Sequence, residues 1–442
     1  MARAQVGSRF GGRGYSRRQV VQGAGAGALG LSLAAFGGAT RFGSVPGVAA
    51  QDATIQLFHD KANWDTFYQQ MGELAESAGG PAVETVPYSN TTSYQQTIQS
   101  SLPTDDVPSV FTWWSGYRME ALYQEGSLLD VSALWQEAIA AGNLPETLAT
   151  AFTFEDKQWG MPNHVSHWPV FYNKTVFDAN SLAVPTTWDE LMAAAETLKG
   201  AGVTPFYATV DGRWPAFIWF EDLLIRTDPD FYEALMRGEE SYTDPLVVGV
   251  MEVWKEMFDK EYFSALDLPM DTGAAPMFAN GEIAMVLNGT WLNQSFVTNG
   301  MTPGEDYGVF ILPNVNPDLQ EKVIIFETGP FLVPSNVENP EAAQAFLTWW
   351  VSPEAQTEWS KLLQDVPSNP QATSESPVLS DLVTQIDEGG YRLIQRYWEA
   401  TPPQIVENAV DELGRFMLNT GEYMSVLETI QSLAEAEWSN RG

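Results

Sequence analysis

Four tryptophans follow or separate strand-like segments, where their rings could form the walls of a ligand site. Trp113 and Trp114 end one apolar stretch and open the loop WWSG, Trp291 follows the apolar stretch EIAMVLNGT, and Trp214 lies in the loop DGRWP. Sheets of parallel strands bind ligands beyond the carboxyl ends of their strands. Aromatic faces there cover the apolar face of a ligand, while carboxylates and amides bind its polar edge. These four tryptophans are therefore candidate ligand-binding residues.

Two histidines, His164 and His167, have the spacing of a metal-binding pair on a helix. The chain holds only 3 histidines, however, prolines bracket the pair at 162 and 169, and no HExxH motif is present. We therefore favour contact with a ligand or between lobes, and we name His167 as a candidate ligand-binding residue. We expect no metal and no cofactor.

The sequence contains no motif that marks an enzyme. A GxSxG elbow, a P-loop and a GxGxxG fingerprint are all absent. A glycosidase needs two carboxylates facing each other across a cleft. With 57 acidic residues some such pair is unavoidable, so their number does not favour an enzyme. We expect no enzymatic activity.

The chain is strongly acidic and contains no cysteine. Six of its 22 basic residues and none of its 57 acidic residues lie in 1–50, so the remainder carries a net charge of −41. Such a surface repels nucleic acids and anionic lipids. The absence of cysteine excludes disulfides, thiolate metal sites and a cysteine nucleophile.

The first fifty residues resemble an export signal. Ser16-Arg17-Arg18 precedes an apolar run of 17 residues, interrupted by four glycines, and the small residues VPGVAA follow. The run is shorter than the roughly 20 apolar residues of a membrane-spanning helix. The paired arginines resemble a twin-arginine signal, which a receptor reads. We expect cleavage after Ala50 and interaction with the twin-arginine export machinery.

Apolar stretches and helical patterns alternate along the rest of the chain, which predicts an α/β fold with two lobes. Strands are expected at 53–58, 81–86 and 108–113, and helices after Asn63, Ser93 and Gly116. A further group of tryptophans is assigned to packing because its members begin or lie within helical segments: Trp188, Trp349, Trp350 and Trp359.

Two helix starts have clear capping signals. Thr187 and Glu190 have the spacing of a capping box. Asn339 precedes Pro340 as a cap, with proline at the first helical position, and Ser352-Pro353 restarts a second helix.

Four phrases, in order along the chain, resemble the extracellular solute-binding proteins of ABC sugar importers, the maltose-binding-like group. Their most recognisable elements are "G-x-P" followed by "YNK" and "P-x-T-W-x-E", and later "F-x-x-G-x-x-A-M-x-x-x-G-x-W". The phrases occupy 110–132, 159–206, 277–291 and 327–356.

This resemblance implies a two-lobe periplasmic-binding-protein fold of type II, in which three crossings join the lobes and a hinge closes them on a ligand. It places the first lobe at 51–166 plus 328–374 and the second at 167–327 plus 375–442, after an export signal at 1–50. It also implies a monomer, periplasmic or at the cell surface, that passes a saccharide to ABC permease subunits.

The resemblance adds charged residues to the expected site. Asp60 and Lys61 occupy the place where maltose-binding-like members offer a charged pair to sugar hydroxyls, and Glu327 lies at a predicted crossing. Family members that bind malto-oligosaccharides often have an Asp-Arg pair after the position of Trp113, where this chain has residues 115–117, Ser-Gly-Tyr. That departure argues against maltose itself.

Two other functions stay open from the sequence. A receptor for polyamines or other cationic solutes would suit an acidic chain with aromatic cleft walls, and a secreted glycoside-active enzyme is a further alternative. Anionic ligands fit worst, because only 16 of the 22 basic residues lie beyond residue 50.

Overall fold

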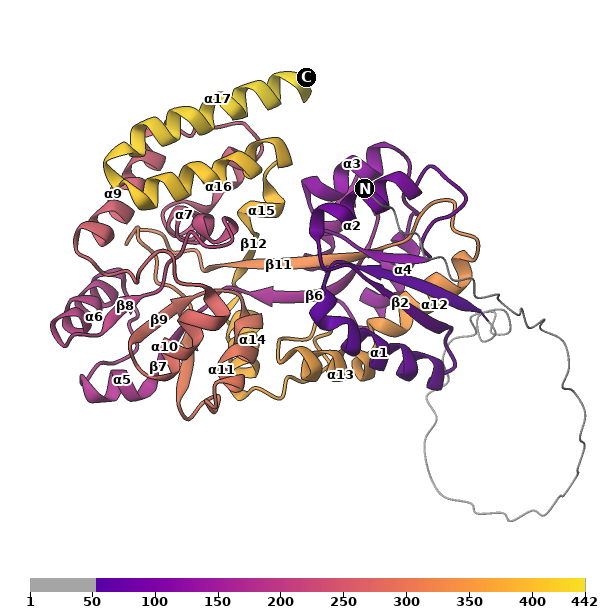
Figure 1. Cartoon of the computed structure of the whole chain (residues 1–442), viewed down its shortest axis with the longest axis horizontal. Coiled ribbons are helices and arrows are strands. Elements are labelled where there is room, and N and C mark those ends of the chain that lie inside the picture. Colours follow the sequence, from indigo (N-terminus) through magenta and orange to yellow (C-terminus); the bar gives the residue numbers. More distant parts are fainter. Residues whose placement is uncertain (1–52, 442) are drawn as a thin grey trace, which may run out of the picture. The chain divides into compact units, whose positions relative to one another are not determined.

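The computed structural model describes residues 53–441, so the predicted export signal and its cleavage site lie outside the described residues (Figure 1). The described residues belong to one compact unit. Strands and helices alternate along the described chain, which confirms the predicted α/β class.

The larger sheet combines parallel strands from the first part of the chain with a long strand from much further along. Its order is β12 (Arg392–Gln395), β11 (Val323–Leu332), β3 (Val110–Thr112), β1 (Thr54–His59) and β2 (Ala82–Pro87), and β6 (Met161–His167) also pairs with β11. β1 is parallel to β2 and β3, whereas β11 is antiparallel to β3 and β6. All ten residues of β11 are buried, as expected for a strand covered on both faces.

A second sheet of four strands is built from the middle of the chain. Its order is β10 (Tyr307–Phe310), β7 (Val170–Asn173), β9 (Ile283–Leu287) and β8 (Thr204–Phe206). β7 is antiparallel to both of its neighbours, whereas β8 and β9 are parallel. A short ribbon, β4 (Thr153–Phe154) and β5 (Lys157–Gln158), stands apart from both sheets.

Helices connect the strands throughout the described chain. Those before β6 are η1 (Ala62–Trp64), α1 (Asp65–Ser77), α2 (Thr91–Ser101), α3 (Tyr117–Gln124), α4 (Ser132–Ala140) and η2 (Glu146–Phe152). Those between β7 and β10 are α5 (Lys174–Ala179), α6 (Trp188–Gly200), η3 (Trp214–Phe217), α7 (Ile218–Ile225), α8 (Pro229–Met236), α9 (Pro245–Asp259), η4 (Met270–Ala274), α10 (Ala275–Ala279), η5 (Thr290–Leu292) and α11 (Asn293–Thr298).

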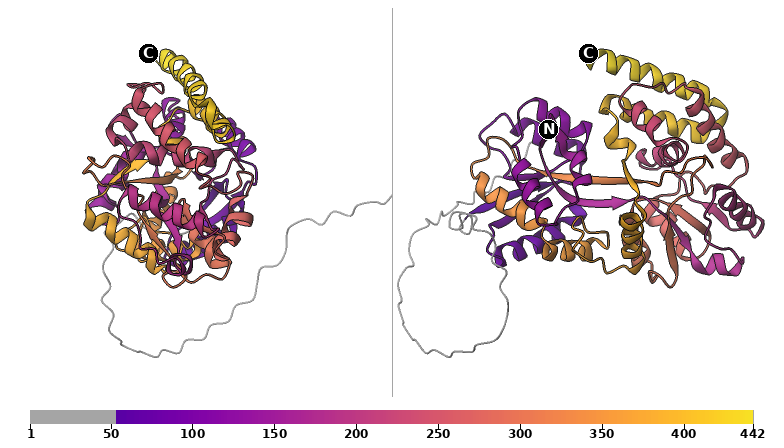
Figure 2. Two further views of the ribbon diagram at one scale, coloured as in Figure 1. Left: turned by 90° about the vertical axis from the view of Figure 1, so that its left-hand side faces the viewer. Right: turned by 180° about the vertical axis from the view of Figure 1, so that it is seen from behind.

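The last part of the chain is mostly helical. Its helices are α12 (Pro340–Trp350), α13 (Pro353–Leu363), α14 (Pro377–Gly389), α15 (Tyr397–Ala400), α16 (Pro403–Leu418), η6 (Thr420–Glu422) and α17 (Tyr423–Arg441). α16 and α17 pack against each other side by side (Figure 2).

The predicted helix starts are confirmed. Thr187 and Glu190 form the capping box of α6, and Asn339 accepts a hydrogen bond from the backbone N–H of Ala342 at the start of α12. Ser352 caps α13 in the same way. The predicted strands at 53–58, 81–86 and 108–113 correspond to β1, β2 and β3.

One predicted helix starts earlier than expected. α2 begins at Thr91, not after Ser93, because the Asn90 side chain accepts a hydrogen bond from the Ser93 backbone N–H at 2.8 Å and so caps the helix. The predicted lobe boundaries are not tested by these observations and stay a prediction.

Trp350 and Trp359 are buried as predicted, within an aromatic cluster that joins α12 and α13 to the larger sheet. The Trp350 ring lies 4.8 Å from the rings of both Phe331 and Trp359, measured between centroids. Its indole N–H donates a hydrogen bond to the backbone oxygen of Asn163 at 3.2 Å.

Replacing Trp350 with alanine should destabilise the protein without changing its ligand site. The substitution removes a side chain that is 0% exposed and leaves a cavity. We expect a loss of about 3–5 kcal/mol in the free energy of unfolding. Chemical denaturation followed by circular dichroism measures this loss. A variant with parental stability would contradict the assignment of Trp350 to the core.

Candidate functional site

A cavity of about 270 Å³ collects most of the residues predicted to bind a ligand. Seven of the eight line it: Asp60, Lys61, Trp113, Trp114, Trp214, Trp291 and Glu327. His164, for which contact with a ligand or between lobes was predicted, also lines it. The other lining residues were not predicted: Trp64, Thr112, Asn163, Thr328, Gly329, Arg396 and Glu399. Segments that are far apart in the sequence therefore meet here.

Two neighbouring strands of the larger sheet deliver the first group of lining residues. β1 and β3 are parallel, with Phe58 opposite Phe111, so the segments that follow them leave the sheet at the same edge. Asp60 and Lys61 follow β1, and Trp113 and Trp114 follow β3.

The second sheet delivers Trp214 and Trp291 by the same rule. β8 and β9 are parallel, with Phe206 opposite Met285, and the chain after each strand continues into a short helix that begins at or next to a tryptophan. The two rings lie 6.1 Å apart between centroids, inclined at 61°. They form one aromatic wall of the cavity.

β11 and β6 carry the part of the cavity between these two groups. Glu327 lies opposite Ser166 and Gly329 opposite His164 in the antiparallel ladder. The Ser115 hydroxyl donates to the backbone oxygen of Thr328 at 2.9 Å, which holds the loop after Trp114 against β11.

Asp60 and Lys61 form an ion pair at 2.8 Å at the edge of the cavity. The Thr112 hydroxyl donates to the other carboxylate oxygen of Asp60 at 3.3 Å. The Lys61 ammonium lies 5.8 Å from the centroid of the Trp114 ring, within cation–π range. Asp60 therefore faces the cavity with its charge already balanced.

A second charged group centres on Arg396, which no sequence pattern indicated. Its guanidinium forms an ion pair with Glu327 and two hydrogen bonds, at 2.9 and 2.5 Å, with Glu399. The Trp291 indole N–H donates to the remaining oxygen of Glu327 at 2.6 Å. Burial raises the pKa of Glu327, and Arg396 opposes that rise by stabilising the carboxylate.

The two adjacent tryptophans after β3 have different environments. Trp113 is only 7% exposed, and its indole N–H donates to the backbone oxygen of Arg118 at 3.0 Å. Trp114 is half-buried and has Arg118 at 5.8 Å from its ring centroid. Arg118 also lies 4.4 Å from the Trp398 ring and pairs with Glu407 at 2.5 Å. The Trp114 ring is therefore the more accessible of the two, and the Arg118 guanidinium lies within cation–π range of it.

The two histidines at 164 and 167 lie on a strand, not on a helix, which changes the meaning of their spacing. Side chains three residues apart on a strand point to opposite faces. His164 lines the cavity, whereas His167 is buried outside the lining, where its backbone N–H donates to the Thr290 hydroxyl at 3.1 Å. His167 is thus the one predicted site residue that the structure does not bring to the cavity. Within residues 53–441, no three potential metal ligands form a cluster.

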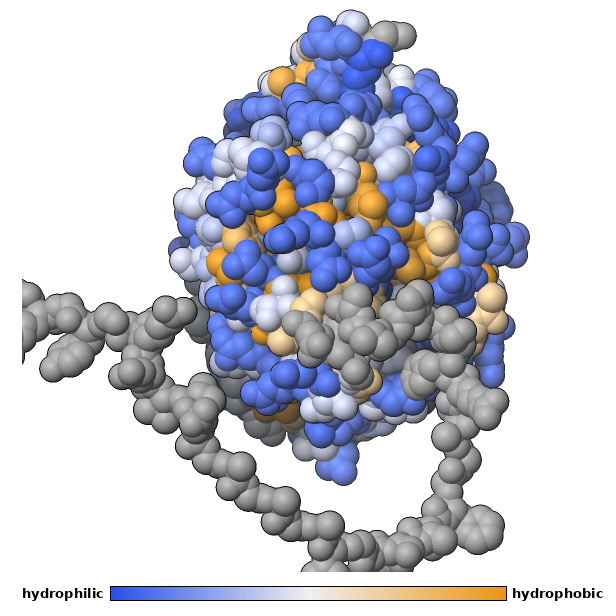
Figure 3. All heavy atoms as spheres, turned by 90° about the vertical axis from the view of Figure 1, so that its right-hand side faces the viewer, coloured by the Kyte–Doolittle hydropathy of each residue, from blue (hydrophilic) through white to orange (hydrophobic). Residues whose placement is uncertain are grey.

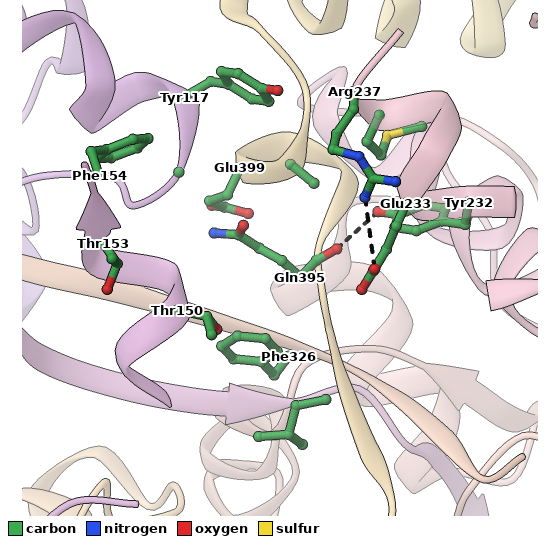
Figure 4. A pocket seen from close by; sticks show the side chains of 14 residues that line it. Tyr117, Thr150, Thr153, Phe154, Tyr232, Glu233, Arg237, Phe326, Gln395 and Glu399 are labelled. Atoms are coloured by element: carbon green, nitrogen blue, oxygen red, sulfur yellow. Dashed lines mark hydrogen bonds and ion pairs between the residues drawn. The ribbon is translucent and has the colours of Figure 1, made fainter. Parts of the chain in front are cut away.

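A second cavity, of about 260 Å³, has Phe326, Gln395 and Glu399 among its lining residues (Figure 4). Phe326 lines this cavity and its neighbour Glu327 lines the first, while Glu399 lines both. The amide of Gln395 points into this second cavity in Figure 4, yet it already donates to the Ser115 hydroxyl at 3.1 Å. We place the candidate ligand site in the first cavity, where aromatic faces and charged pairs converge.

The comparisons with known proteins agree with this architecture. A family model described as a bacterial extracellular solute-binding protein matches residues 70–384. The chain therefore belongs to the bacterial extracellular solute-binding proteins, which confirms the resemblance predicted from the sequence.

Individual relatives match along most of the chain. An uncharacterised ABC transporter extracellular-binding protein of Pyrococcus horikoshii is 27% identical over 77% of this chain and 74% of its own length. An α-glucosides-binding periplasmic protein of Rhizobium meliloti is 23% identical over 59% of this chain and 67% of its own. Other curated relatives match along about half of their own length.

The fold is shared with solved solute receptors. A bacterial receptor described as preferring β-D-galactopyranose superimposes with a TM-score of 0.75 at 22% identity, covering 87% of this chain and 99% of its own. This likeness confirms the predicted two-lobe solute-binding fold. In the described part of the chain, no helix is both long and apolar enough to cross a bilayer.

The histidines provide a direct test of the environment around the cavity. Burial lowers the pKa of His164 to about 3, with Lys61 and Arg396 adding to the effect, and lowers that of His167 to about 4. Burial also lowers the pKa of His59, despite its hydrogen bond with Asp65. All three should stay neutral at neutral pH.

We therefore expect that the rings of His164 and His167 do not titrate between about pH 5 and 8 in NMR spectra, where a free imidazole would. Because unfolding restores an ordinary pKa near 6.5, the stabilising contribution of each is complete above that pH and is lost as the pH falls to about 4 for His167 and about 3 for His164. A ring that titrates near 6.5 in the folded protein would show that its site is open to solvent.

Proposed function

We propose that this protein is an exported substrate-binding protein of an ABC transporter, which binds a neutral sugar or oligosaccharide in the first cavity. One observation carries the proposal: aromatic faces from both sheets converge on hydrogen-bonding groups that are already paired with one another. A sugar ring combines an apolar C–H face with a hydroxyl edge, and this cavity offers a surface for each. The relatives that bind α-glucosides or galactopyranose support the same class of ligand.

The charge balance favours a neutral ligand over an anion. Lys61 is paired with Asp60, and Arg396 is shared between Glu327 and Glu399, so neither cation is free for a phosphate or carboxylate. Paired groups still offer lone pairs and N–H groups to hydroxyls at little further desolvation cost.

A receptor for polyamines or other cations remains the second candidate, for one specific reason. Arg396 serves two carboxylates, which leaves about one net negative charge beside the aromatic wall of Trp214 and Trp291. Aromatic walls also bind organic cations. Direct comparison of saccharides with polyamines separates the two candidates.

We further propose that the protein is not an enzyme. A glycosidase needs one carboxyl group that gives a proton and a second that acts as base or nucleophile. Both oxygens of Glu327 are bound, one by Trp291 and one by Arg396, and both oxygens of Glu399 are bound by Arg396. Asp60 is held by Lys61 and Thr112.

The remaining parts of the proposal concern the setting of the protein. The sequence pattern of residues 1–50 supports export through the twin-arginine route and cleavage after Ala50. Membership of the family supports a periplasmic or cell-surface location and delivery to permease subunits, and we propose a monomeric state. The lobe boundaries at 166/167, 327/328 and 374/375 belong to the same proposal, and so does the role of Trp113, Trp114, Trp214 and Trp291 as ligand contacts.

Replacing Trp291 with alanine should weaken ligand binding at least tenfold. The substitution removes an aromatic face worth about 1–3 kcal/mol and also the N–H that holds Glu327. A thermal-shift screen with D-galactose, maltose, N,N′-diacetylchitobiose and spermidine identifies the ligand, and calorimetry then measures the affinity. Trp349→Ala is the matched control, because Trp349 is half-buried on α12 and does not line the cavity.

If folded Trp291→Ala binds the ligand with parental affinity, the assignment of Trp291 to the ligand site is wrong. Binding of spermidine in preference to every saccharide would instead favour the cationic-solute receptor. Equal losses in the Trp291 and Trp349 variants would indicate a general effect of destabilisation.

Incubation with the saccharide that binds should release no product. Since every carboxylate lining the cavity is held by a neighbouring donor, we expect no new reducing ends over hours. A reducing-sugar assay checks this, with heat-treated protein as the blank. Release of product that disappears in Glu327→Gln would identify an enzyme.

A further inference from the structure

The backbone that leads into Trp214 has a rare conformation. Arg213 has φ 65° and ψ −59°, and the Trp214 backbone N–H donates to the Gly212 oxygen at 2.8 Å. These angles and this hydrogen bond define a γ-turn with positive φ, the rare and strained of its two forms. A residue with a Cβ atom keeps such a backbone only where the surrounding contacts hold it there. The residue that follows this strained turn, Trp214, lines the first cavity.

The side chain of Arg213 supplies contacts that can hold the turn. Its Nε and Nη2 donate to the two carboxylate oxygens of Asp411 on α16, at 2.7 and 2.9 Å. Nη2 also donates to the backbone oxygen of Glu407, about one helical turn earlier, at 2.8 Å. Two parallel hydrogen bonds to one carboxylate fix the plane of a guanidinium. The side chains of Arg213 and Asp411 are 55% and 58% exposed, so water screens the pair, and it contributes more to orientation than to stability.

This ion pair joins α16 to one aromatic wall of the cavity from outside its lining. None of residues 403–418, which form α16, lines the cavity. Trp214 begins η3 directly after the turn, and its ring lies 6.1 Å from Trp291 and 6.2 Å from Trp168, measured between centroids. A change in the backbone of Arg213 would therefore alter the direction in which the Trp214 ring enters the cavity.

The same face of α16 also contacts the other aromatic group of the cavity. Glu407 lies four residues before Asp411 and therefore on the same side of the helix. It pairs with Arg118 at 2.5 Å, and Arg118 lies 5.8 Å from the centroid of the Trp114 ring. The Glu407 carboxylate is also 3.9 Å from the Arg213 guanidinium. One face of α16 thus contacts an arginine beside each of two aromatic groups of the cavity.

We propose that Asp411 is a positioning residue for Trp214. Its carboxylate holds the Arg213 guanidinium on α16, and the guanidinium in turn holds the strained turn that carries Trp214 into the cavity. Without the carboxylate, Arg213 relaxes to a negative φ, and the Trp214 ring loses its place beside Trp291. The effect on ligand affinity rests on the proposed function, whereas the effect on the Trp214 ring does not.

The chain offers a matched control on the same helix. Glu412 is the next residue after Asp411, and its carboxylate accepts two hydrogen bonds from Arg415, of which the one from Nε measures 2.9 Å. Arg415 lies within α16 itself, and neither residue of this pair lines the cavity. Glu412→Gln therefore removes one charge and one arginine contact from α16 without affecting the turn at Arg213.

The test uses the ligand-free protein with 5-fluorotryptophan incorporated, with the Trp214 resonance assigned by Trp214→Phe. We expect Asp411→Asn to shift or broaden this 19F resonance and Glu412→Gln to leave it unchanged. Arg213→Ala should displace it as well. Adding Asp411→Asn to Arg213→Ala should then have no further effect, because the carboxylate acts through the guanidinium. For the saccharide found in the screen, Kd should rise about tenfold in Asp411→Asn, and by no more than in Trp214→Ala.

An unchanged Trp214 resonance in Asp411→Asn would overturn the proposal whatever the ligand is. An equal displacement in Glu412→Gln would also overturn it, because the cause would then be the charge of α16. So would a further displacement when Asp411→Asn is added to Arg213→Ala, since Asp411 would not act through Arg213. If the resonance moves in Asp411→Asn but the saccharide binds with parental affinity, Trp214 is not a ligand contact. The proposed ligand site then fails at Trp214, and the role of Asp411 stands.

Discussion

The guanidinium of Arg396, whose side chain is 12% exposed, makes the interactions on which the candidate site depends. It joins Glu327 on β11 to Glu399 on α15, and through Glu327 it reaches Trp291 on η5. Removing charges from water is costly, and a buried ion loses several kcal/mol if its partner is deleted. Pairing inside the protein allows three ionised groups to stand at the edge of a cavity. It also fixes the aromatic wall, because the Trp291 N–H has one strong acceptor and a defined orientation.

The parallel strands explain why these groups meet. In both sheets the segments that follow parallel neighbours leave at one edge, which brings Lys61 beside Trp114 in one case and Trp214 beside Trp291 in the other. β11 contributes to two cavities, with Glu327 lining one and Phe326 the other. Any bend of this strand therefore alters both cavities together.

Local signals and family phrases predicted most of the fold, but they could not predict every side-chain direction. Caps such as Thr187 and Asn339 act within one turn, so the sequence contains the whole interaction. Trp113 is more deeply buried than Trp114 because its backbone N–H still donates to the Pro330 oxygen and so continues the pairing of β3 with β11. The sequence alone does not show where this pairing ends. The spacing of His164 and His167 suggested one shared face only on the assumption of a helix. Arg396, and with it Glu399, escaped notice because the partner that brings Arg396 to the cavity, Glu327, lies far away in the chain.

The net charge of the whole molecule also affects which ligands the paired charges at the cavity attract. Hydrophilic residues make up most of the described surface on the face shown in Figure 3. The residues after 50 carry a net charge of −41. Such a field attracts cations to any unpaired carboxylate in a cleft. Lys61 and Arg396 are among only 16 basic residues in that part of the chain, and both lie beside carboxylates that line the cavity. Placing scarce cations there removes the strongest electrostatic attraction for small cations. Hydroxyl groups, which bind paired charges without displacing either partner, are then left as the ligands best matched to the site.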